Sequence, residues 1–316
     1  MRTFWHRFLI LLLTCYVVAS AHSAPVNVTA RQFRFGVLQQ PADGSDVPLR
    51  EAIVRANQKN LAFLVVNGIK SKNEPCSDTF YQQRKNLLNE SEKAIVVSLA
   101  GSDWIECKSE EGKPLAVERL QRLRELYFDG GTTLGAKKMR LVRQSLTAKF
   151  RSFSENGYWR QGKILFATVN LPAANNHYLA AAGRNSEFED RLIANRDWLQ
   201  RIFSLARIHK MRGIVLFADG NPIAKPARRS DGSRDGFLEV RKQIMLLTAR
   251  FPGRVLLVHG HAPTSNAQIA WRDNLGTIGA GKDWLEITAN PAAMQVFSAS
   301  HARHVKTSAS KKNQHK

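Results

Sequence analysis

The sequence predicts an α/β fold in which short buried strands alternate with amphipathic helices. Apolar runs recur along the chain between segments of helical periodicity, an alternation typical of parallel strands joined by right-handed crossovers. One run, Val255 to Val258, lies between Gly253 and Gly260, as expected of a strand covered on both faces. The length of 316 residues and the hydrophobic content of 43% are enough to form a large core.

The first half of the chain predicts three strands and three helices in alternation. Each expected strand is an apolar run that ends in a polar turn, and each expected helix has apolar residues three or four positions apart. The strands cover residues 33–38, 61–66 and 94–99, and the helices cover 47–58, 79–91 and 114–128. The spacing in the first helix directs Leu49, Ile53, Val54 and Ala56 towards the sheet.

The second half continues the same alternation and ends in two more strands. Expected strands cover residues 163–170, 213–218, 254–258, 284–288 and 294–300, and expected helices cover 187–210 and 236–250. The helix 187–210 has a long apolar stripe that includes Ile193, Trp198 and Ile208. Neither an internal repeat nor a linker is present, so residues 24–300 are predicted to form a single domain.

The N-terminus has the pattern of a secretory signal peptide, residues 1–23. Basic residues precede an apolar block, 8–20, that is shorter than the roughly 20 residues a membrane span requires. Small residues allow cleavage after Ala21 or after Ser23. We expect export to the periplasm or secretion, and a mature chain with no transmembrane segment. An uncleaved signal anchor is the alternative.

The chain is strongly basic, with a formal net charge of +21. Cleavage of the signal would remove only Arg2 and Arg7 from this balance. Such a field attracts polyanions and anionic surfaces. The segment 137–151 has six basic residues and no acid, which we interpret as a solvated face, and the basic tail 301–316 is expected to be disordered.

Two cysteines, Cys76 and Cys107, remain once the signal with Cys15 is removed. An even number in an exported chain predicts a disulfide bond between them. Closing that loop would contribute roughly 3 to 4 kcal/mol in the chain-entropy model. Two buried free thiols are the alternative.

Polar turns follow several of the expected strands. In open α/β sheets the carboxyl ends of the strands form the ligand crevice, so side chains in these turns are predicted to share one site. The predicted crevice residues are Gln40, Asn67, Ser102, Asp103, Asp219, Asn221, His259 and His261. A loop at Asn175 to His177 is interpreted as a surface loop, with a place in the crevice as the alternative.

Short motifs flank these turns, and together they resemble a calcineurin-like metallophosphoesterase. They are Ile69-Lys70-Ser71, Pro75-Cys76-Ser77-Asp78, Trp104 with Cys107, Asp235-Gly236, and the run from Val255 to Gly260. The resemblance covers about residues 33–300 and is closest to an exported bacterial subgroup. It implies a β-sandwich of mixed sheets flanked by helices, with two metal ions held by Asp, Asn and His in the turns.

Most metal ligands implied by the resemblance are substituted in this chain. Gln40 and Ala42 stand where the first turn has Asp and His, and Asn67-Gly68 stand where the second has Gly-Asp. In the third turn, Gly101 and Ser102 replace Asp and Asn.

The later turns are also altered. Asp103 is the only acid left in the third turn, and in the fourth turn Asp219 or Asn221 stands near the position of the family's lone His. The last turn keeps His261, whereas Pro263 replaces its second His.

A pair of metal ions needs a dense set of carboxylate and imidazole ligands. We therefore expect no dinuclear centre and no cofactor. The alternative is a single Zn or Mn ion held by His259, His261 and Asp103, in which Asp103 and His261 are the candidate catalytic residues.

The leading hypothesis is an exported pseudo-enzyme that has lost its metals and binds a phosphorylated or other anionic ligand. One alternative is a residual phosphoesterase with a single metal ion. A second is a basic module that binds polyanions or cell surfaces through residues 137–151, 225–234 and the tail. Sequence-specific nucleic-acid recognition is not expected, because no aromatic platform accompanies the basic residues. The sequence indicates no oligomeric state.

Overall fold

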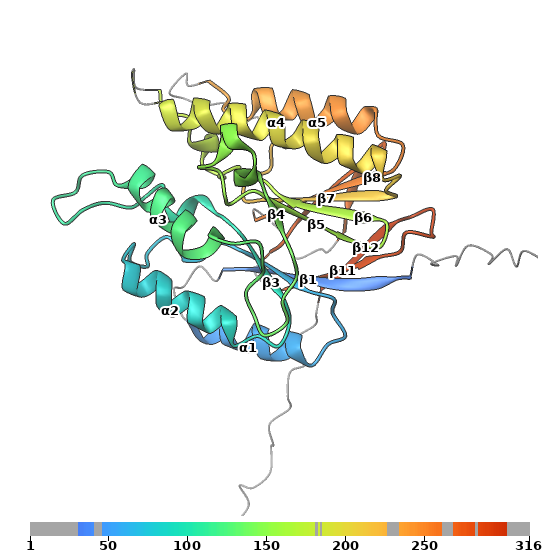
Figure 1. Ribbon diagram of the computed structural model, residues 1–316, viewed down its shortest axis with the longest axis horizontal. Coiled ribbons are helices and arrows are strands. Elements are labelled where there is room, and N and C mark those ends of the chain that lie inside the picture. Colours follow the sequence, from blue (N-terminus) through green and yellow to red (C-terminus); the bar gives the residue numbers. More distant parts are fainter. Residues whose placement is uncertain are drawn as a thin grey trace, which may run out of the picture.

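The computed structural model shows a sandwich of two mixed β-sheets with helices on both outer faces (Figure 1). It describes residues 31–40, 46–180, 183, 185–225, 234–260, 268–281 and 284–301. The predicted α/β class, with mixed sheets flanked by helices, is confirmed. The predicted signal peptide and residues 302–316 of the predicted tail lie outside the described residues. Within the described ranges, no helix is long and apolar enough to cross a membrane.

The first sheet has the strand order β12-β11-β1-β2-β3. Its strands are β1 (Phe33–Gln39), β2 (Leu64–Asn67), β3 (Ile95–Ser98), β11 (Leu285–Ala289) and β12 (Phe297–His301). The first three are parallel, as the alternation of strands and helices predicts, whereas β11 and β12 pair antiparallel. His301 belongs to β12 and not to the predicted tail, because it pairs with Leu285.

The second sheet has the order β4-β5-β6-β7-β8-β10-β9. Its strands are β4 (Val142–Arg143), β5 (Gly157–Gln161), β6 (Ile164–Thr168), β7 (Gly213–Ala218), β8 (Arg254–His259), β9 (Ala270–Arg272) and β10 (Leu275–Gly279). Strands β6, β7, β8 and β10 are parallel, and the outer strands are antiparallel. Strands β4, β5, β9 and β10 were not predicted from the sequence, because they are short or half-exposed and contain no continuous apolar run.

Helices cover the two outer faces of the sandwich. Helices α1 (Asp46–Asn57), α2 (Asp78–Asn89) and α3 (Ala116–Phe128) pack on the first sheet, and α4 (Ser186–Ile208) and α5 (Leu238–Ala249) pack on the second. The inward orientation predicted for Val54, Ile193 and Ile208 is wrong, since these side chains are 52%, 51% and 72% exposed. Val54 directly follows Ile53, which lies about 100° away around the helix and occupies the buried face.

Aromatic side chains fill the space between the two sheets. The ring of Phe63, which directly precedes β2, lies 5.0 Å from that of Phe166 and 5.4 Å from that of Trp159 in the second sheet, and the ring of Phe35 in β1 lies 5.3 Å from that of Phe166. Edge-to-face contacts of this kind are favourable and directional, so they contribute to the alignment of the sheets as well as to the buried apolar area. The strand ends of the two sheets are thereby positioned against each other.

Candidate functional site

The carboxyl ends of the central parallel strands of both sheets meet at one edge of the sandwich. In the first sheet Asn67 pairs with Gln39, and in the second His259 pairs with Ala218. Gly260 lies at the junction, where an added Cβ would overlap Asn67 Nδ2 and lie 2.9 Å from both Gln39 Oε1 and Asp219 Oδ1. The predicted meeting of these turns is therefore observed.

The residues gathered at this edge form what we call the strand-end cluster. Its members are Gln39, Gln40, Asn67, Asp219, Asn221 and His259. Gln40, Asn67, Asp219 and His259 are buried, whereas Asn221 is partly exposed. His261 lies outside the described residues, so its predicted place in the site stays a prediction.

Asp219 joins three loops that come from distant parts of the chain. Its Oδ2 accepts hydrogen bonds from the backbone N–H groups of Gly101 and Ala173, both at 2.8 Å. Its backbone carbonyl accepts the N–H of Gly260 at 3.0 Å. This residue therefore fastens the loops after β3, β6 and β8 together at the edge of the sandwich.

Asn221 holds His259 in one orientation. Asn221 Oδ1 accepts the N–H groups of Ile223 and Ala224, so its amide group presents Nδ2 to the imidazole. That nitrogen lies 3.1 Å from His259 Nε2. Because an amide nitrogen is only a donor, Nε2 must accept this hydrogen bond, which places the proton of a neutral ring on Nδ1.

Two amide side chains of the cluster are buried without a full set of hydrogen bonds. Gln40 is 6% exposed and Asn67 is 4% exposed. Asn67 Nδ2 donates to Gln39 Oε1 at 2.9 Å, but within the described residues Asn67 Oδ1 and both amide atoms of Gln40 have no partner. Buried polar groups of this kind are uncommon, because each unmade hydrogen bond costs about 1 to 3 kcal/mol.

Asp103 is fully buried beside the strand-end cluster, and its carboxylate accepts hydrogen bonds from backbone N–H groups. Oδ1 accepts the N–H groups of Ile69 and Lys70 at 2.7 and 3.0 Å, and Oδ2 accepts that of Ala100 at 2.8 Å. Complete burial raises the pKa of Asp103 to about 7, opposed by the three N–H donors and reinforced by Asp219. Asp103 therefore joins the loop after β2 to the loop after β3.

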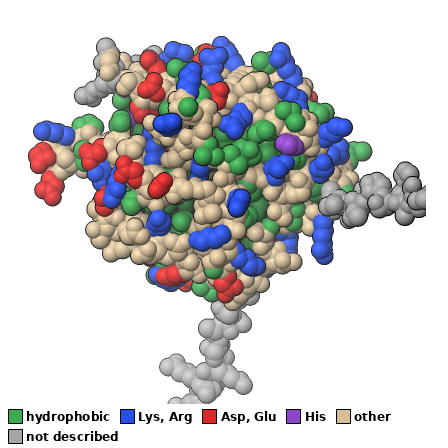
Figure 2. All heavy atoms as spheres, in the orientation of Figure 1, with side chains coloured by type: hydrophobic (Ala, Val, Ile, Leu, Met, Phe, Trp, Pro, Cys, Tyr) green, Lys and Arg blue, Asp and Glu red, His purple; other side chains and the backbone are tan. Residues whose placement is uncertain are grey.

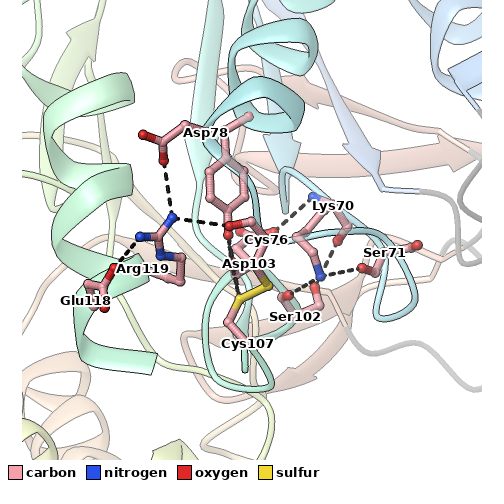
Figure 3. The surroundings of a disulfide bond; sticks show 10 residues. Lys70, Ser71, Cys76, Asp78, Ser102, Asp103, Cys107, Glu118 and Arg119 are labelled. Carbon is pink, nitrogen blue, oxygen red and sulfur yellow. Dashed lines mark hydrogen bonds and ion pairs between the residues drawn. A yellow bond between two sulfur atoms is a disulfide. The ribbon is translucent and has the colours of Figure 1, made fainter. Parts of the chain in front are cut away.

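A disulfide bond ties the same two loops together (Figure 3). Cys76 and Cys107 are bonded with a Cα–Cα distance of 5.8 Å, which confirms the predicted pairing. The buried Lys70 donates from Nζ to the carbonyl groups of Ser71 and Ser102 at 2.8 and 3.0 Å. Burial lowers the pKa of Lys70, although the nearby carboxylates oppose this effect.

We call the group of Lys70, Cys76, Tyr81, Ser102, Asp103 and Cys107 the disulfide cluster. Tyr81 donates its hydroxyl proton to the carbonyl of Asp103 at 2.8 Å. Ser102, predicted to line the crevice, donates its hydroxyl to the carbonyl of Lys70 at 3.0 Å. The side chains of Ser102 and Asp103 thus make structural bonds within this cluster.

The residues present can be compared with the requirements of a metal centre. Across the described ranges, no three His, Cys, Asp or Glu side chains are grouped so that they could hold a metal ion. The side chains of the strand-end cluster that could bind a metal ion are mainly neutral amides. The carboxylate oxygens of Asp103 and Asp219 accept hydrogen bonds from backbone N–H groups. This set does not fit a pair of divalent cations, which needs bridging carboxylates. A single ion held with His261 stays a prediction.

In the loop from Asn175 to His177, Asn176 and His177 are buried and Asn175 is partly exposed, so the interpretation as a surface loop is wrong for the last two residues. All three residues have positive φ, at 48°, 53° and 54°. The fully buried Arg191 holds this conformation, because it donates to the carbonyl of Asn176 at 2.8 Å and to its Oδ1 at 2.5 Å. Asn tolerates the left-handed region better than most residues, and the Asn-Asn pair was the available sequence signal.

His177 belongs to a buried ionic network that the sequence analysis did not identify. His177 Nδ1 lies 2.8 Å from Glu187 Oε2, and Arg191 Nε donates to Glu187 Oε1 at 2.6 Å. Burial alone would raise the pKa of Glu187, but Arg191 and His177 outweigh it and hold this pKa at about 2. The imidazole also packs edge-on against Trp104, beside the disulfide cluster, with ring centroids 4.7 Å apart.

The predicted basic face, residues 137–151, is only partly solvated. Lys137, Lys138 and Arg140 are exposed, as predicted, whereas Arg143 is 5% exposed. On the face drawn in Figure 2, Lys and Arg side chains are distributed widely and do not form one dense patch. Arg143 is buried because β4 pairs with β5, a hairpin that the sequence analysis missed.

Comparisons with known proteins show distant structural similarity only. No protein-family model matches the chain, and no curated protein matches it. Among solved structures, the chain is similar to PhoD, with 10% identity over 82% of this chain and 64% of that one, at a TM-score of 0.46. It is also similar to a Staphylococcus aureus protein provisionally described as a 5'-nucleotidase, solved with alpha-ketoglutarate, with 13% identity over 86% and 53% of the chains, at a TM-score of 0.45.

A hypothetical protein from Thermus thermophilus is similar at 13% identity over 77% of this chain and 74% of that one, with a TM-score of 0.37. The chain spans less than two thirds of the length of PhoD and of the Staphylococcus aureus protein. At these values the similarities assign neither an activity nor a ligand to this chain.

Proposed function

We propose that this protein is an exported pseudo-enzyme that binds a small phosphorylated or other anionic ligand at the strand-end cluster without a pair of metal ions. The observation that supports this proposal best is the set of unfilled hydrogen bonds on Gln40 and Asn67. Their amide groups are buried where the strands of both sheets end, the position at which α/β proteins bind ligands.

The amide groups suit a ligand that both donates and accepts hydrogen bonds. Gln40 offers an unused donor and an unused acceptor, and Asn67 offers an unused acceptor. A phosphate monoester with hydroxyl groups could complete all three, because its oxygens accept and its hydroxyls donate. The formal net charge of +21 favours the approach of an anion over that of a cation.

The carboxylates near the cluster support binding over two-metal hydrolysis. Asp103 and Asp219 use their oxygens to hold loop backbones, so they stabilise the architecture. A metal ion that recruited either carboxylate would have to replace those hydrogen bonds. The neutral ligands Gln and Asn do not offset the repulsion between two divalent ions.

Calorimetric titration of the full-length mature protein with inorganic phosphate, ribose 5-phosphate and AMP tests the proposal. We expect at least one probe to bind saturably in chelator-treated protein. We expect Gln40→Leu and Asn67→Leu each to weaken binding about tenfold, as loss of a hydrogen bond to a charged group would. Gln82→Leu replaces an exposed glutamine of α2 and is the matched control.

Assays of metal-dependent hydrolysis test the alternative, a residual phosphoesterase. The mature protein is assayed with p-nitrophenyl phosphate and bis(p-nitrophenyl) phosphate, with and without Mn or Zn. Metal-stimulated hydrolysis that is abolished by His261→Ala would replace this proposal with the residual phosphoesterase that has a single metal ion. Failure of all three phosphorylated probes to bind would also overturn it.

A further inference from the structure

A cavity separate from the strand-end cluster lies between α3 and the segment that follows β4. Its volume is about 450 Å³, within the range of about 300 to 1,000 Å³ typical of small-molecule sites. Arg143, Arg151, Ser145 and Ser152 supply polar groups to its lining, and Phe128 and Leu141 supply apolar ones. The cavity therefore combines cationic and hydroxyl donors with an apolar wall.

Arg143 is the unusual member of this lining. Its Nε donates to the carbonyl of Gly130 at 3.2 Å, and its guanidinium lies over the ring of Phe128 with 5.2 Å to the centroid. Within the described residues, its buried Nη1 has no acceptor. Burial lowers the pKa of Arg143 to about 10, opposed by Glu155, so the side chain still carries its charge at neutral pH.

Among the charges beside the cavity, two arginines share one buried glutamate, and the two carboxylates of the lining, Glu125 and Asp129, are exposed. The carboxylate of the buried Glu155 acts to raise the pKa of Arg143. However, Arg124 binds this carboxylate through two hydrogen bonds of 2.7 and 2.8 Å. Asn170 Nδ2 also donates to Glu155 at 3.0 Å. At the exposed rim, Glu125 is paired with Arg122 at 2.9 Å. Glu155 thus serves both Arg143, which is buried, and Arg124, which is partly buried.

A buried cation without an anionic partner is costly, because desolvation is not repaid by a charge pair. An incoming oxyanion would supply the missing charge and accept from the guanidinium, which presents planar N–H groups suited to carboxylate and phosphate. Ser145 and Ser152 can add hydroxyl donors. Phe128 and Leu141 are buried side chains of the cavity lining, and Leu146, another lining residue, is exposed and offers contact area to an apolar body.

We propose that this cavity is a second binding site, which takes a small organic anion with an apolar body. Arg143 contacts the oxyanion, and Leu146 contacts the apolar part. The site does not depend on the strand-end cluster, because none of its lining residues belongs to that cluster. The oxyanion is a carboxylate or a phosphate monoester, and the choice of probe distinguishes them.

Ligand-observed NMR and calorimetry on the mature protein test this site with benzoate, phenyl phosphate and neutral benzamide. We expect saturable binding of benzoate or phenyl phosphate and at least tenfold weaker binding of benzamide. Tighter binding of phenyl phosphate would indicate a phosphorylated ligand, and tighter binding of benzoate a carboxylate. In either case Arg143→Gln should weaken binding at least tenfold.

Two further variants separate a local role from loss of folding or of net charge. Arg151 is exposed, so Arg151→Gln should keep the fold and weaken binding about threefold. Arg160→Gln removes the same charge from an exposed position outside the cavity lining and should leave binding unchanged. The proposal is overturned if neither anion binds, if benzamide binds equally well, or if Arg160→Gln and Arg151→Gln weaken binding equally.

Discussion

The disulfide cluster and the strand-end cluster are neighbours, yet their polar groups are satisfied to very different degrees. Gly68 lies between them, since an added Cβ there would be 3.4 Å from Gln40 Cβ and 3.7 Å from Asp103 Oδ1. On one side, Asp103 accepts three backbone N–H groups and Lys70 donates to two carbonyls. On the other side, Gln40 has no side-chain partner in the described part of the chain.

The difference suggests different roles for two adjacent groups of buried residues. Fully bonded polar clusters stabilise one conformation, because any displacement breaks several hydrogen bonds together. Unfilled hydrogen bonds reduce stability, and proteins retain them mainly where something else completes them. The disulfide cluster thus has the properties of a support, whereas the strand-end cluster has the unfilled hydrogen bonds on which the proposed binding site rests.

The largest expected effect comes from removing the disulfide bond of the disulfide cluster. A Cys76→Ser/Cys107→Ser double variant should lower the free energy of unfolding by about 3 to 4 kcal/mol, because the unfolded chain regains the freedom of the loop that the disulfide closes. Urea denaturation of the two proteins measures this. Reductant should destabilise the wild type to a similar extent and leave the double variant unchanged. Equal stability of oxidised wild type and variant would show that the disulfide does not support this region.

A smaller effect should follow from titration of Asp103. Burial raises the pKa of Asp103 to about 7 from its ordinary value of 3.8, so the folded protein binds more protons than the unfolded one between these values. Stability contributed by this group should therefore fall as the pH rises through that window. Between pH 5 and pH 8, the unfolding free energy should fall by about 2 to 3 kcal/mol more in the wild type than in Asp103→Asn. Parallel pH profiles would contradict this.

The smallest expected effect comes from removing an unsatisfied amide of the strand-end cluster. Gln40→Leu should raise the free energy of unfolding of the ligand-free protein by about 1 kcal/mol, because it removes a buried amide with two unmade hydrogen bonds. Thermal and chemical denaturation measure the change, with exposed Gln82→Leu as the control. Destabilisation by Gln40→Leu would mean that its amide group is satisfied, and the contrast between the clusters would disappear.

Periodicity in the sequence predicted the parts of the fold that depend on local pattern. The buried runs that became β2, β3, β7 and β8 are continuous and apolar, so these central strands could be predicted. The antiparallel strands of the second sheet, β4, β5 and β9, could not. For example, β5 has the sequence Gly-Tyr-Trp-Arg-Gln, with two exposed residues, and contains no apolar run.

The site could be predicted only in part, for a similar reason. Strand ends meet at one edge of a sheet, and this rule was enough to bring Asn67, Asp219 and His259 together. The hydrogen bonds that occupy Asp103 and the burial of Arg143 depend on loops far apart in sequence, which leave no periodic signal. The sequence therefore predicted that these residues lie together, and it could not predict which of their polar groups are already bonded.

Gly260 has a consequence for how this protein can vary among its natural relatives. No side chain fits at this position while amides stand at positions 39 and 67 and a carboxylate stands at 219. Even a methyl group would displace the amide of Asn67 from its hydrogen bond with Gln39. We therefore expect glycine at position 260 to be inherited together with that set of neighbours, and a relative with a larger residue there to have exchanged Asn67 for a shorter side chain.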